Sequence, residues 1–271
     1  MSLVETDWLE KNFDKVKIID SSWHMPQAKR DGFKEYKVQH IHNAIFFDLD
    51  NNSKKNSILP HMLVEKEDWE KIVSKMGIKE TDEIVVYDNS EVISACRCWF
   101  NFIYFGHDPK LIHVLNGGLS KWMNEKRKVT NILNNFKITD YKSFEKKELV
   151  KDKKMITENI DNQNFKIIDA RSRERFEGKV PEPRKGLKSG NIKNSFCIPF
   201  GECLNDDKTF KNKDELKNIF RSCLENISDK DIVFSCGSGV TACVLALAYS
   251  LINDKYHPSI YDGSWAEYGI I

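Results

Sequence analysis

Short apolar runs alternate with helical patterns along the whole chain. Runs rich in Ile and Val occur at 17–20, 83–88, 111–115, 165–169, 231–235 and 259–261. Between them, segments 68–77 and 214–227 place apolar residues at three- and four-residue spacing, the pattern of an amphipathic helix. Segment 240–252 is apolar nearly all round, which is typical of a buried helix. This alternation predicts an α/β fold with a largely parallel sheet.

The two halves of the chain repeat the same landmarks in the same order. A KIID run ends at Asp20 and again at Asp169, and a strand pattern ends at Asp88 and again at Cys236. Two further landmarks, the turn that begins at Ile41 and the NGG of 116–118, recur in the second half at similar offsets. Such a repeat indicates one domain that has been duplicated.

A connector separates the two copies. Segment 124–154 contains no Gly or Pro and is dominated by Lys and Asn, as expected of a chain that crosses the surface and is ordered by contact. We expect an N-terminal domain at 1–135, a connector at 136–155 and a C-terminal domain at 156–271.

Composition narrows the class of protein. The chain has 271 residues, of which 40% are hydrophobic, so it can bury a sizeable core. Its 42 basic and 41 acidic residues give a net charge of +1, which argues against nucleic acid and anionic membrane as partners. The absence of a long apolar run and of a basic, apolar leader in the first twenty residues favours a cytoplasmic protein. Seven scattered cysteines without a C-x-x-C pair indicate neither a disulfide framework nor a metal site.

The second copy has a cysteine where the first has Asp88. Cys236 stands between a strand pattern and an apolar helix, and it opens a loop formed by Gly237, Ser238, Gly239, Val240 and Thr241. The two glycines allow positive φ and close backbone approach, so successive N–H groups can form an anion-binding nest at the positive end of the helix. That position favours a thiolate and cradles any anion or terminal sulfur on it. A buried cysteine before an ordinary glycine turn is the alternative, and the loop with its repeat context favours the nucleophile.

Several motifs together resemble the two-domain rhodanese family of sulfurtransferases, and within it most closely the 3-mercaptopyruvate sulfurtransferases. They are DSSWHMP (20–26), VLNGGLSKW (114–122), DARSRERFEG (169–178), PEPRKG (181–186), CGSGVTAC (236–243) and YDGSWAEYG (261–269). The resemblance spans almost the whole chain. It implies tandem rhodanese-like α/β domains, each with a mainly parallel sheet flanked by helices.

The resemblance also implies a reaction. Cys236 takes sulfur from 3-mercaptopyruvate as a persulfide and releases pyruvate, and a thiol acceptor such as thioredoxin, or cyanide, then removes the sulfur. It implies no cofactor and no metal. Arg175 and Arg184 match the family's arginines for the carboxylate and carbonyl of the substrate, and a small keto acid does need a forked cation to fix it.

Three more residues take roles from the resemblance. Asp50 and Ser238 match residues proposed to form a relay with the cysteine, and His61 matches a histidine near the substrate. The family's turn glycines are replaced here by Asn43 and Asn194. Because Asn tolerates the left-handed conformation, we expect both turns to survive.

Other functions remain open at this stage. The family's thiosulfate sulfurtransferases carry basic residues directly after the cysteine, whereas Gly237 and Ser238 are neutral, which favours the keto acid. A non-catalytic interaction module is a further alternative, since Asp88 leaves the first copy without the nucleophile. A cysteine-loop phosphatase needs an arginine six residues after the cysteine, and that residue is Ala242.

Overall fold

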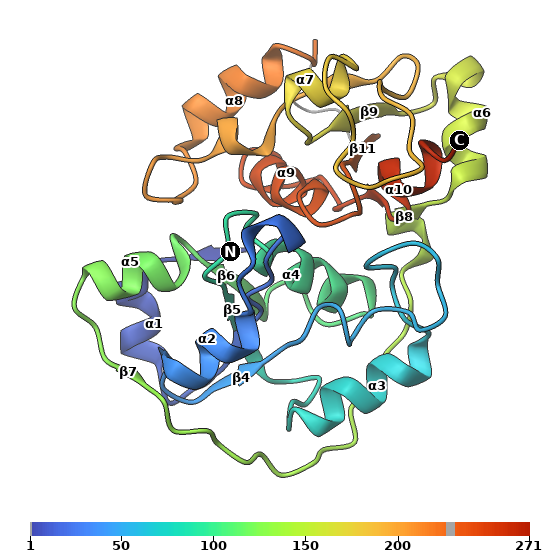
Figure 1. The fold of residues 1–271 in the computed structure, drawn as a ribbon. Coiled ribbons are helices and arrows are strands. Elements are labelled where there is room, and N and C mark those ends of the chain that lie inside the picture. Colours follow the sequence, from blue (N-terminus) through green and yellow to red (C-terminus); the bar gives the residue numbers. More distant parts are fainter. Residues whose placement is uncertain (1, 226–230) are drawn as a thin grey trace. The chain divides into compact units, whose positions relative to one another are not determined.

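The computed structural model describes residues 2–225 and 231–271. The chain divides into two compact units, which are drawn in Figure 1. Unit 1 comprises residues 1–55, 63–146 and 206–209, and unit 2 comprises 56–62, 147–205 and 210–271. Two short segments, 56–62 and 206–209, thus belong to a different unit from their neighbours in sequence. We expected each domain to be one continuous stretch of the chain, so the sequence did not predict that these two segments belong to the other unit.

Unit 1 is built on a five-stranded sheet in which every strand pair is parallel. Its strand order is β1-β6-β5-β2-β4, with β1 at Leu3–Val4, β2 at Val16–Asp20, β4 at Ala44–Phe46, β5 at Glu83–Tyr87 and β6 at Ile112–Leu115. The helices are α1 (Thr6–Asn12), α2 (Gly32–Val38), α3 (Lys66–Lys75), α4 (Ala95–Tyr104) and α5 (Gly118–Asn124), and Pro26–Ala28 forms a 3-10 turn. A small antiparallel pair joins β3 (His40–Ile41) to β7 (Val129–Thr130).

Unit 2 repeats this architecture. Its sheet has the order β10-β9-β11-β12-β8 and is again parallel throughout, with β8 at Val150–Lys151, β9 at Lys166–Asp169, β10 at Phe196–Cys197, β11 at Ile232–Ser235 and β12 at Ile260–Tyr261. The helices are α6 (Lys153–Asn162), α7 (Arg173–Phe176), α8 (Lys213–Arg221), α9 (Ala242–Ser250) and α10 (Ser264–Tyr268). Lys147–Leu149 and Phe200–Cys203 form 3-10 turns. Read in the direction β8-β12-β11-β9-β10, this order corresponds strand by strand to β1-β6-β5-β2-β4 of unit 1, as a duplication requires.

The α/β prediction is confirmed in detail. All six apolar runs are strands, and the three helical patterns correspond to α3, α8 and α9. Helix α8 ends at Arg221, and the last two residues of the helix predicted to reach 227 lie outside the described residues. The six runs do not include the outer strands β1, β4 and β8, whereas β10 lies in the strand-like segment 196–200. Within the described ranges, no helix combines the length and apolar character needed to cross a bilayer.

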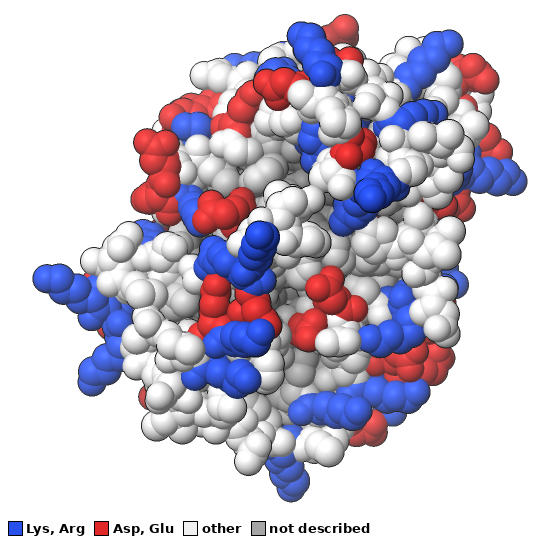
Figure 2. Space-filling model, viewed as in Figure 1, with Lys and Arg blue, Asp and Glu red and all other residues white. Residues whose placement is uncertain are grey.

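A hydrophobic core anchors each sheet. In unit 1, Leu9, Tyr36 and Leu119 bring α1, α2 and α5 onto one face of the sheet, where they meet Ile18 and Val85. In unit 2, every residue of α9 except the last is buried, and α9 packs against β11 (Figure 1). On the face drawn in Figure 2, basic and acidic side chains are interspersed.

Both asparagine turns adopt the predicted conformation. Asn43 has φ 61° and Asn194 has φ 64°, so each takes the left-handed conformation in place of glycine. The connector is also ordered by contact, as expected. The N–H of Thr139 donates to the carbonyl of Ser74, and Tyr141 is buried with its hydroxyl 3.2 Å from Nδ1 of His107.

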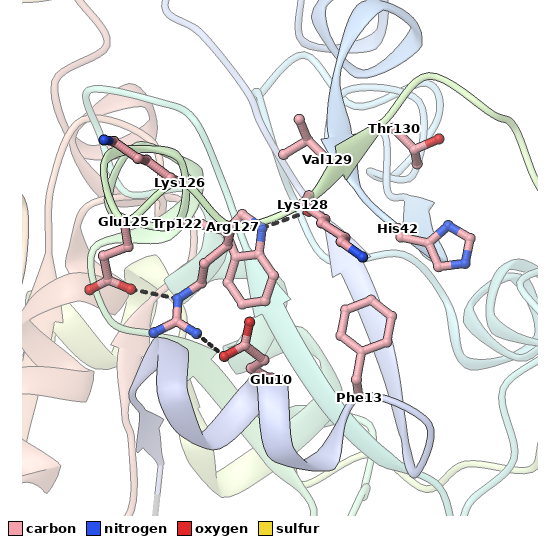
Figure 3. Close-up of a pocket in the computed structure, with 10 residues that line it drawn as sticks. All are labelled: Glu10, Phe13, His42, Trp122, Glu125, Lys126, Arg127, Lys128, Val129 and Thr130. Carbon is pink, nitrogen blue, oxygen red and sulfur yellow. Dashed lines mark hydrogen bonds and ion pairs between the residues drawn. The ribbon is translucent and has the colours of Figure 1, made fainter.

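A pocket of about 770 Å³ opens in unit 1 (Figure 3). Phe13 stacks on His42, and the Trp122 indole donates to the carbonyl of Lys128. The guanidinium of Arg127 is held by the carboxylates of Asp7, Glu10 and Glu125. No cysteine and none of the predicted site residues is among those that line this pocket.

Asp20 and its duplicate Asp169 end equivalent strands in different electrostatic surroundings. Asp169 is paired with the guanidinium of Arg171, two residues later, at 2.7 Å. Ser22 occupies the matching position in unit 1 and donates its N–H and hydroxyl to Oδ1 of Asp20 at 2.9 and 2.6 Å. Burial dominates over these bonds and raises the pKa of Asp20 to about 6. At neutral pH the ionised carboxylate of Asp20 therefore lowers the stability of unit 1.

We predict that Asp20→Asn removes a pH-dependent loss of stability. Because the folded-state pKa of about 6 exceeds the ordinary 3.8, the stabilisation linked to the bound proton is complete below pH 3.8 and is lost as the pH rises through 6. The shift corresponds to about 3 kcal/mol. Free energies of unfolding from urea titrations of variant and parent should therefore differ by that much more at pH 8 than at pH 4. A pH-independent difference would contradict the assignment.

Candidate active site around Cys236

Residues 236–241 link the end of β11 to the start of α9. Cys236 opens this loop and is 2% exposed. The sequence allowed positive φ at both Gly237 and Gly239, and Gly239 adopts it, with φ 76°. Gly237 is needed for a different reason, since a methyl group on it would lie 3.2 Å from Nη2 of Arg175 and 3.7 Å from Nη1 of Arg184. A side chain at Gly237 would therefore crowd Arg175, whereas Arg184 would stay at ordinary contact distance, and both guanidinium groups lie close to the backbone beside the thiol.

Ser264 braces this loop. Its Oγ accepts the N–H of Cys236 at 3.2 Å and that of Gly239 at 3.1 Å, and it donates to the carbonyl of Tyr261 at 2.8 Å. Ser264 is fully buried and has φ 49°, a conformation that costs a non-glycine residue about 1 kcal/mol or more. The matching residue of unit 1 is Gly118, with φ 54°. The hydroxyl of Ser264 is thus held in a strained position by three hydrogen bonds.

The brace changes our expectation for the anion nest. We expected successive N–H groups of the loop to point inward, but those of Cys236 and Gly239 are taken by Ser264. The remaining loop N–H groups make no hydrogen bond within the part of the chain that the structure describes: those of Gly237, Ser238, Val240 and Thr241. Thr241 occupies the N-cap position of α9, but its side chain makes no capping hydrogen bond.

Unit 1 shows the same loop filled by an anion. Asp88 stands at the position of Cys236, and its Oδ2 accepts the hydroxyls of Ser90 at 2.6 Å and Ser94 at 3.1 Å. Burial raises the pKa of Asp88, and these hydroxyls together with the N–H of Ala95 at the start of α4 oppose part of the rise. A carboxylate of unit 1 therefore uses the loop and helix start as an anion site.

Ser238 lies between a histidine and an arginine. Its Oγ is 3.0 Å from Nδ1 of His61 and accepts a hydrogen bond from Nη2 of Arg184 at 3.3 Å. Because Arg184 can only donate, the hydroxyl proton of Ser238 is available to His61. Both Ser238 and His61 are 6% exposed. His61 has φ 60°, and its segment, 56–62, is part of unit 2.

Arg175 is held by a carboxylate. Its Nε and Nη2 donate to Oε1 and Oε2 of Glu182 at 3.2 and 2.6 Å. Glu182 also binds the fully buried Arg171, which in turn pairs with Asp169 at the end of β9. This chain of ion pairs runs from the sheet to the backbone of Gly237.

The structure gathers most of the predicted site residues in unit 2: Arg175, Arg184, His61 and the loop of 236–241. Asp50 belongs to unit 1, where its Oδ1 accepts the indole N–H of Trp23 at 3.0 Å. Sequence reasoning missed Glu182 and Ser264 as site residues. Both stand inside recognised motifs, but a single acid or serine in such a motif carries no signal of its buried partners.

Comparisons with known proteins show the family to which the chain belongs. The family model described as Rhodanese-like domain matches residues 5–125 and 152–270. "Thiosulfate/3-mercaptopyruvate sulfurtransferase 1, mitochondrial" of Arabidopsis thaliana is 39% identical over 98% of this chain and 75% of its own length. "3-mercaptopyruvate sulfurtransferase" of Mus musculus is 33% identical over 98% of this chain and 91% of its own.

A solved structure shares the fold over the same extent. The crystal structure of SseA from Escherichia coli, whose title refers to the "Rhodanese" fold and catalytic mechanism of 3-mercaptopyruvate sulfotransferases, superimposes with a TM-score of 0.86 at 30% identity. The match covers 98% of this chain and 100% of that one. The prediction of two tandem α/β domains of this family is confirmed.

We predict that Ser264→Gly lowers the reactivity of Cys236. Glycine keeps the backbone conformation, as Gly118 shows in unit 1, but removes the acceptor of two loop N–H groups. Loss of a hydrogen bond worth about 1 kcal/mol corresponds to roughly fivefold in rate. The measurement is the rate of alkylation of Cys236 by iodoacetamide, read from its peptide by mass spectrometry.

Ser250→Ala is the matched control for this variant. It removes a hydroxyl that donates to the carbonyl of Leu247 at 2.7 Å, at the far end of the same α9. Its alkylation rate should equal that of the parent. Equal rates in Ser264→Gly and the parent would show that the brace does not position the thiol.

Proposed function

Because the chain belongs to the family of tandem rhodanese-like domains, we propose that it is a 3-mercaptopyruvate sulfurtransferase with Cys236 as the sulfur carrier. The observation that carries this proposal is the approach of two guanidinium groups to Gly237, directly after the buried thiol. A forked cation beside a nucleophile suits a small keto acid whose carboxylate must be fixed next to the attacked sulfur. No metal or cofactor enters this reaction.

The proposed transfer conserves atoms and electrons. The Cys236 thiolate attacks the sulfur of 3-mercaptopyruvate, an S–S bond forms, and the C–S bond breaks with its electron pair moving to carbon. The proton of the donor thiol ends on that carbon, so the products are pyruvate and an ionised persulfide on Cys236. The unbonded loop N–H groups then face the terminal sulfur and stabilise its charge.

Ser238 and His61 are placed to move this proton. The hydroxyl of Ser238 lies beside both the imidazole of His61 and the guanidinium of Arg184, so it links substrate binding to proton transfer. Asp50 remains a proposed third member of the relay on the family resemblance alone. Thr241 and Val240 act through their backbone N–H groups.

The acceptor and the compartment belong to the proposal as well. We propose a thiol acceptor such as thioredoxin, with cyanide as a laboratory acceptor, because a persulfide gives up its outer sulfur to soft nucleophiles. The cytosol stays a prediction from the sequence, whereas the Arabidopsis relative carries the word mitochondrial in its name. Cell fractionation with an antibody against the native chain decides between the two.

Thiosulfate is the second candidate donor. The Arabidopsis relative is named for both donors. The residues that follow Cys236 are neutral, but Arg175 and Arg184 bring positive charge to the same place, and a doubly charged donor needs such charge. Specificity constants for the two donors, measured on the purified protein, rank them directly.

We predict that Cys236→Ser abolishes sulfur transfer from both donors and changes the free energy of unfolding by no more than about 1 kcal/mol, as mild substitutions do. After incubation with 3-mercaptopyruvate, the parent should gain the mass of one sulfur atom on the Cys236 peptide. Cys223→Ser, which alters a half-buried thiol of unit 2, serves as the control and should keep full activity. Turnover by Cys236→Ser, or a parent without the added sulfur, favours the non-catalytic module.

We predict that Arg184→Lys raises the KM for 3-mercaptopyruvate at least tenfold, since lysine keeps the charge but cannot present two parallel N–H groups. Arg173→Lys is the control, because Arg173 pairs with Glu202 at the surface of the same unit. Steady-state kinetics with varied donor give both constants. If KM stays unchanged in Arg184→Lys, the substrate carboxylate binds elsewhere.

A further inference from the structure

Glu182 has a role in this site that goes beyond holding a side chain in place. We propose that Glu182 limits the positive charge beside Cys236 and thereby makes the site favour a singly charged sulfur donor over a doubly charged one. The inference rests on the proposed function, because it concerns the choice between its two candidate donors.

The contacts of Glu182 make it the counter-ion of the donor-binding arginine. Its side chain is 2% exposed, and both of its oxygens are used by the guanidinium of Arg175. Arg171, which is fully buried, donates to Oε1 at 2.7 Å. Arg171 already has a carboxylate partner in Asp169, so Glu182 chiefly offsets the charge of Arg175.

Arg175 lies between Glu182 and the loop of Cys236, so the charge balance of the Arg175–Glu182 pair acts close to the thiol. Its Nη2 contacts Glu182 at 2.6 Å and lies 3.2 Å from the place of a Gly237 methyl group, next to Cys236. Because Glu182 and Cys236 are each only 2% exposed, a change of one charge on Glu182 acts on an anion bound beside the thiol with less screening than at the surface. Its effect is proportional to the charge of the anion. A dianion such as thiosulfate therefore feels it twice as strongly as the monoanion of 3-mercaptopyruvate.

The chain offers a matched control within the same helix. Arg173, the other arginine of α7, forms a similar fork with Glu202, in which Nε donates to Oε1 at 3.2 Å and Nη2 to Oε2 at 2.9 Å. Both partners are exposed there, at 52% for Arg173 and 41% for Glu202. Glu202→Gln thus removes the same charge from the same kind of pair, at a place where water screens it.

The first test is the ratio of kcat/KM for thiosulfate to that for 3-mercaptopyruvate. Glu182→Gln should raise this ratio at least fivefold. Glu182→Asp, which keeps the charge but shifts the fork, and Glu202→Gln should both stay within twofold of the parent. An unchanged ratio in Glu182→Gln, or an equal rise in either of the other two variants, overturns the proposal.

The second test needs no turnover, so it separates a failure of this inference from a failure of the proposed function. At low salt, the alkylation rates of Cys236 by iodoacetate, an anion, and by iodoacetamide, which is neutral, report the local charge. The iodoacetate-to-iodoacetamide ratio should rise in Glu182→Gln. It should fall in Arg175→Gln, which removes the cation that Glu182 offsets and shows that the probe senses charge at this place. If Glu182→Gln does not fold, Glu182→Ala removes the same charge and should raise the ratio. A ratio that stays at the parent value when the charge of Glu182 is removed shows that Glu182 does not set the charge at the thiol.

Discussion

The register of β9 against β11 is the constraint on which the site of unit 2 depends. In this parallel pair Asp169 lies opposite Ser235, so the two strands end at the same level of the sheet. Strand β9 is followed by Arg171 and α7, and strand β11 is followed by Cys236 and α9. The ion pairs of Asp169, Arg171, Glu182 and Arg175 and the backbone of the thiol loop consequently meet at one edge, as ligand sites of parallel sheets do. A shift of one residue in this register would separate the arginines from the thiol.

The two units show how one loop serves opposite purposes. In unit 1 the loop after β5 holds the carboxylate of Asp88 against the start of α4, and the brace position is Gly118. In unit 2 a thiol replaces the carboxylate, and Ser264 supplies the oxygen that orders the loop. The side chain of Asp88 fills the first loop, whereas the second loop has N–H groups that make no hydrogen bond within the described residues. The two units therefore share one architecture, but only unit 2 has a cysteine at this position of the loop.

Charge around Cys236 comes from outside its loop. The residues that follow the cysteine are neutral, and the sequence alone pointed to a loop without cations. The structure brings Arg175 and Arg184 to Gly237 and places Glu182 behind Arg175. The charge beside the thiol thus arises from residues of two motifs outside the loop, DARSRERFEG (169–178) and PEPRKG (181–186). A comparison of the two residues after the cysteine does not capture that charge.

The sequence by itself determined the duplicated α/β plan, the central strands, the buried α9, the asparagine turns and the position of Cys236 at a glycine loop before a helix. Each of these follows from a local pattern: apolar periodicity, the tolerance of Asn for positive φ, or the spacing of a strand, a loop and a helix. The family resemblance added Arg175, Arg184, His61 and Ser238 as candidates, but not how they meet.

Only the tertiary structure decided the remaining parts of the site. It showed the outer strands β1, β4 and β8, the assignment of His61 to unit 2 with segment 56–62, the three hydrogen bonds of Ser264 and the two arginine partners of Glu182. His61 and Ser264 depend on contacts with residues distant in the chain, whereas Glu182 lies only seven and eleven residues from its two partners, in a loop whose course the local pattern does not show. A buried carboxylate or hydroxyl must find a partner, but its sequence neighbourhood does not say which one, because that choice depends on how the strands are ordered and on which loops close over their ends.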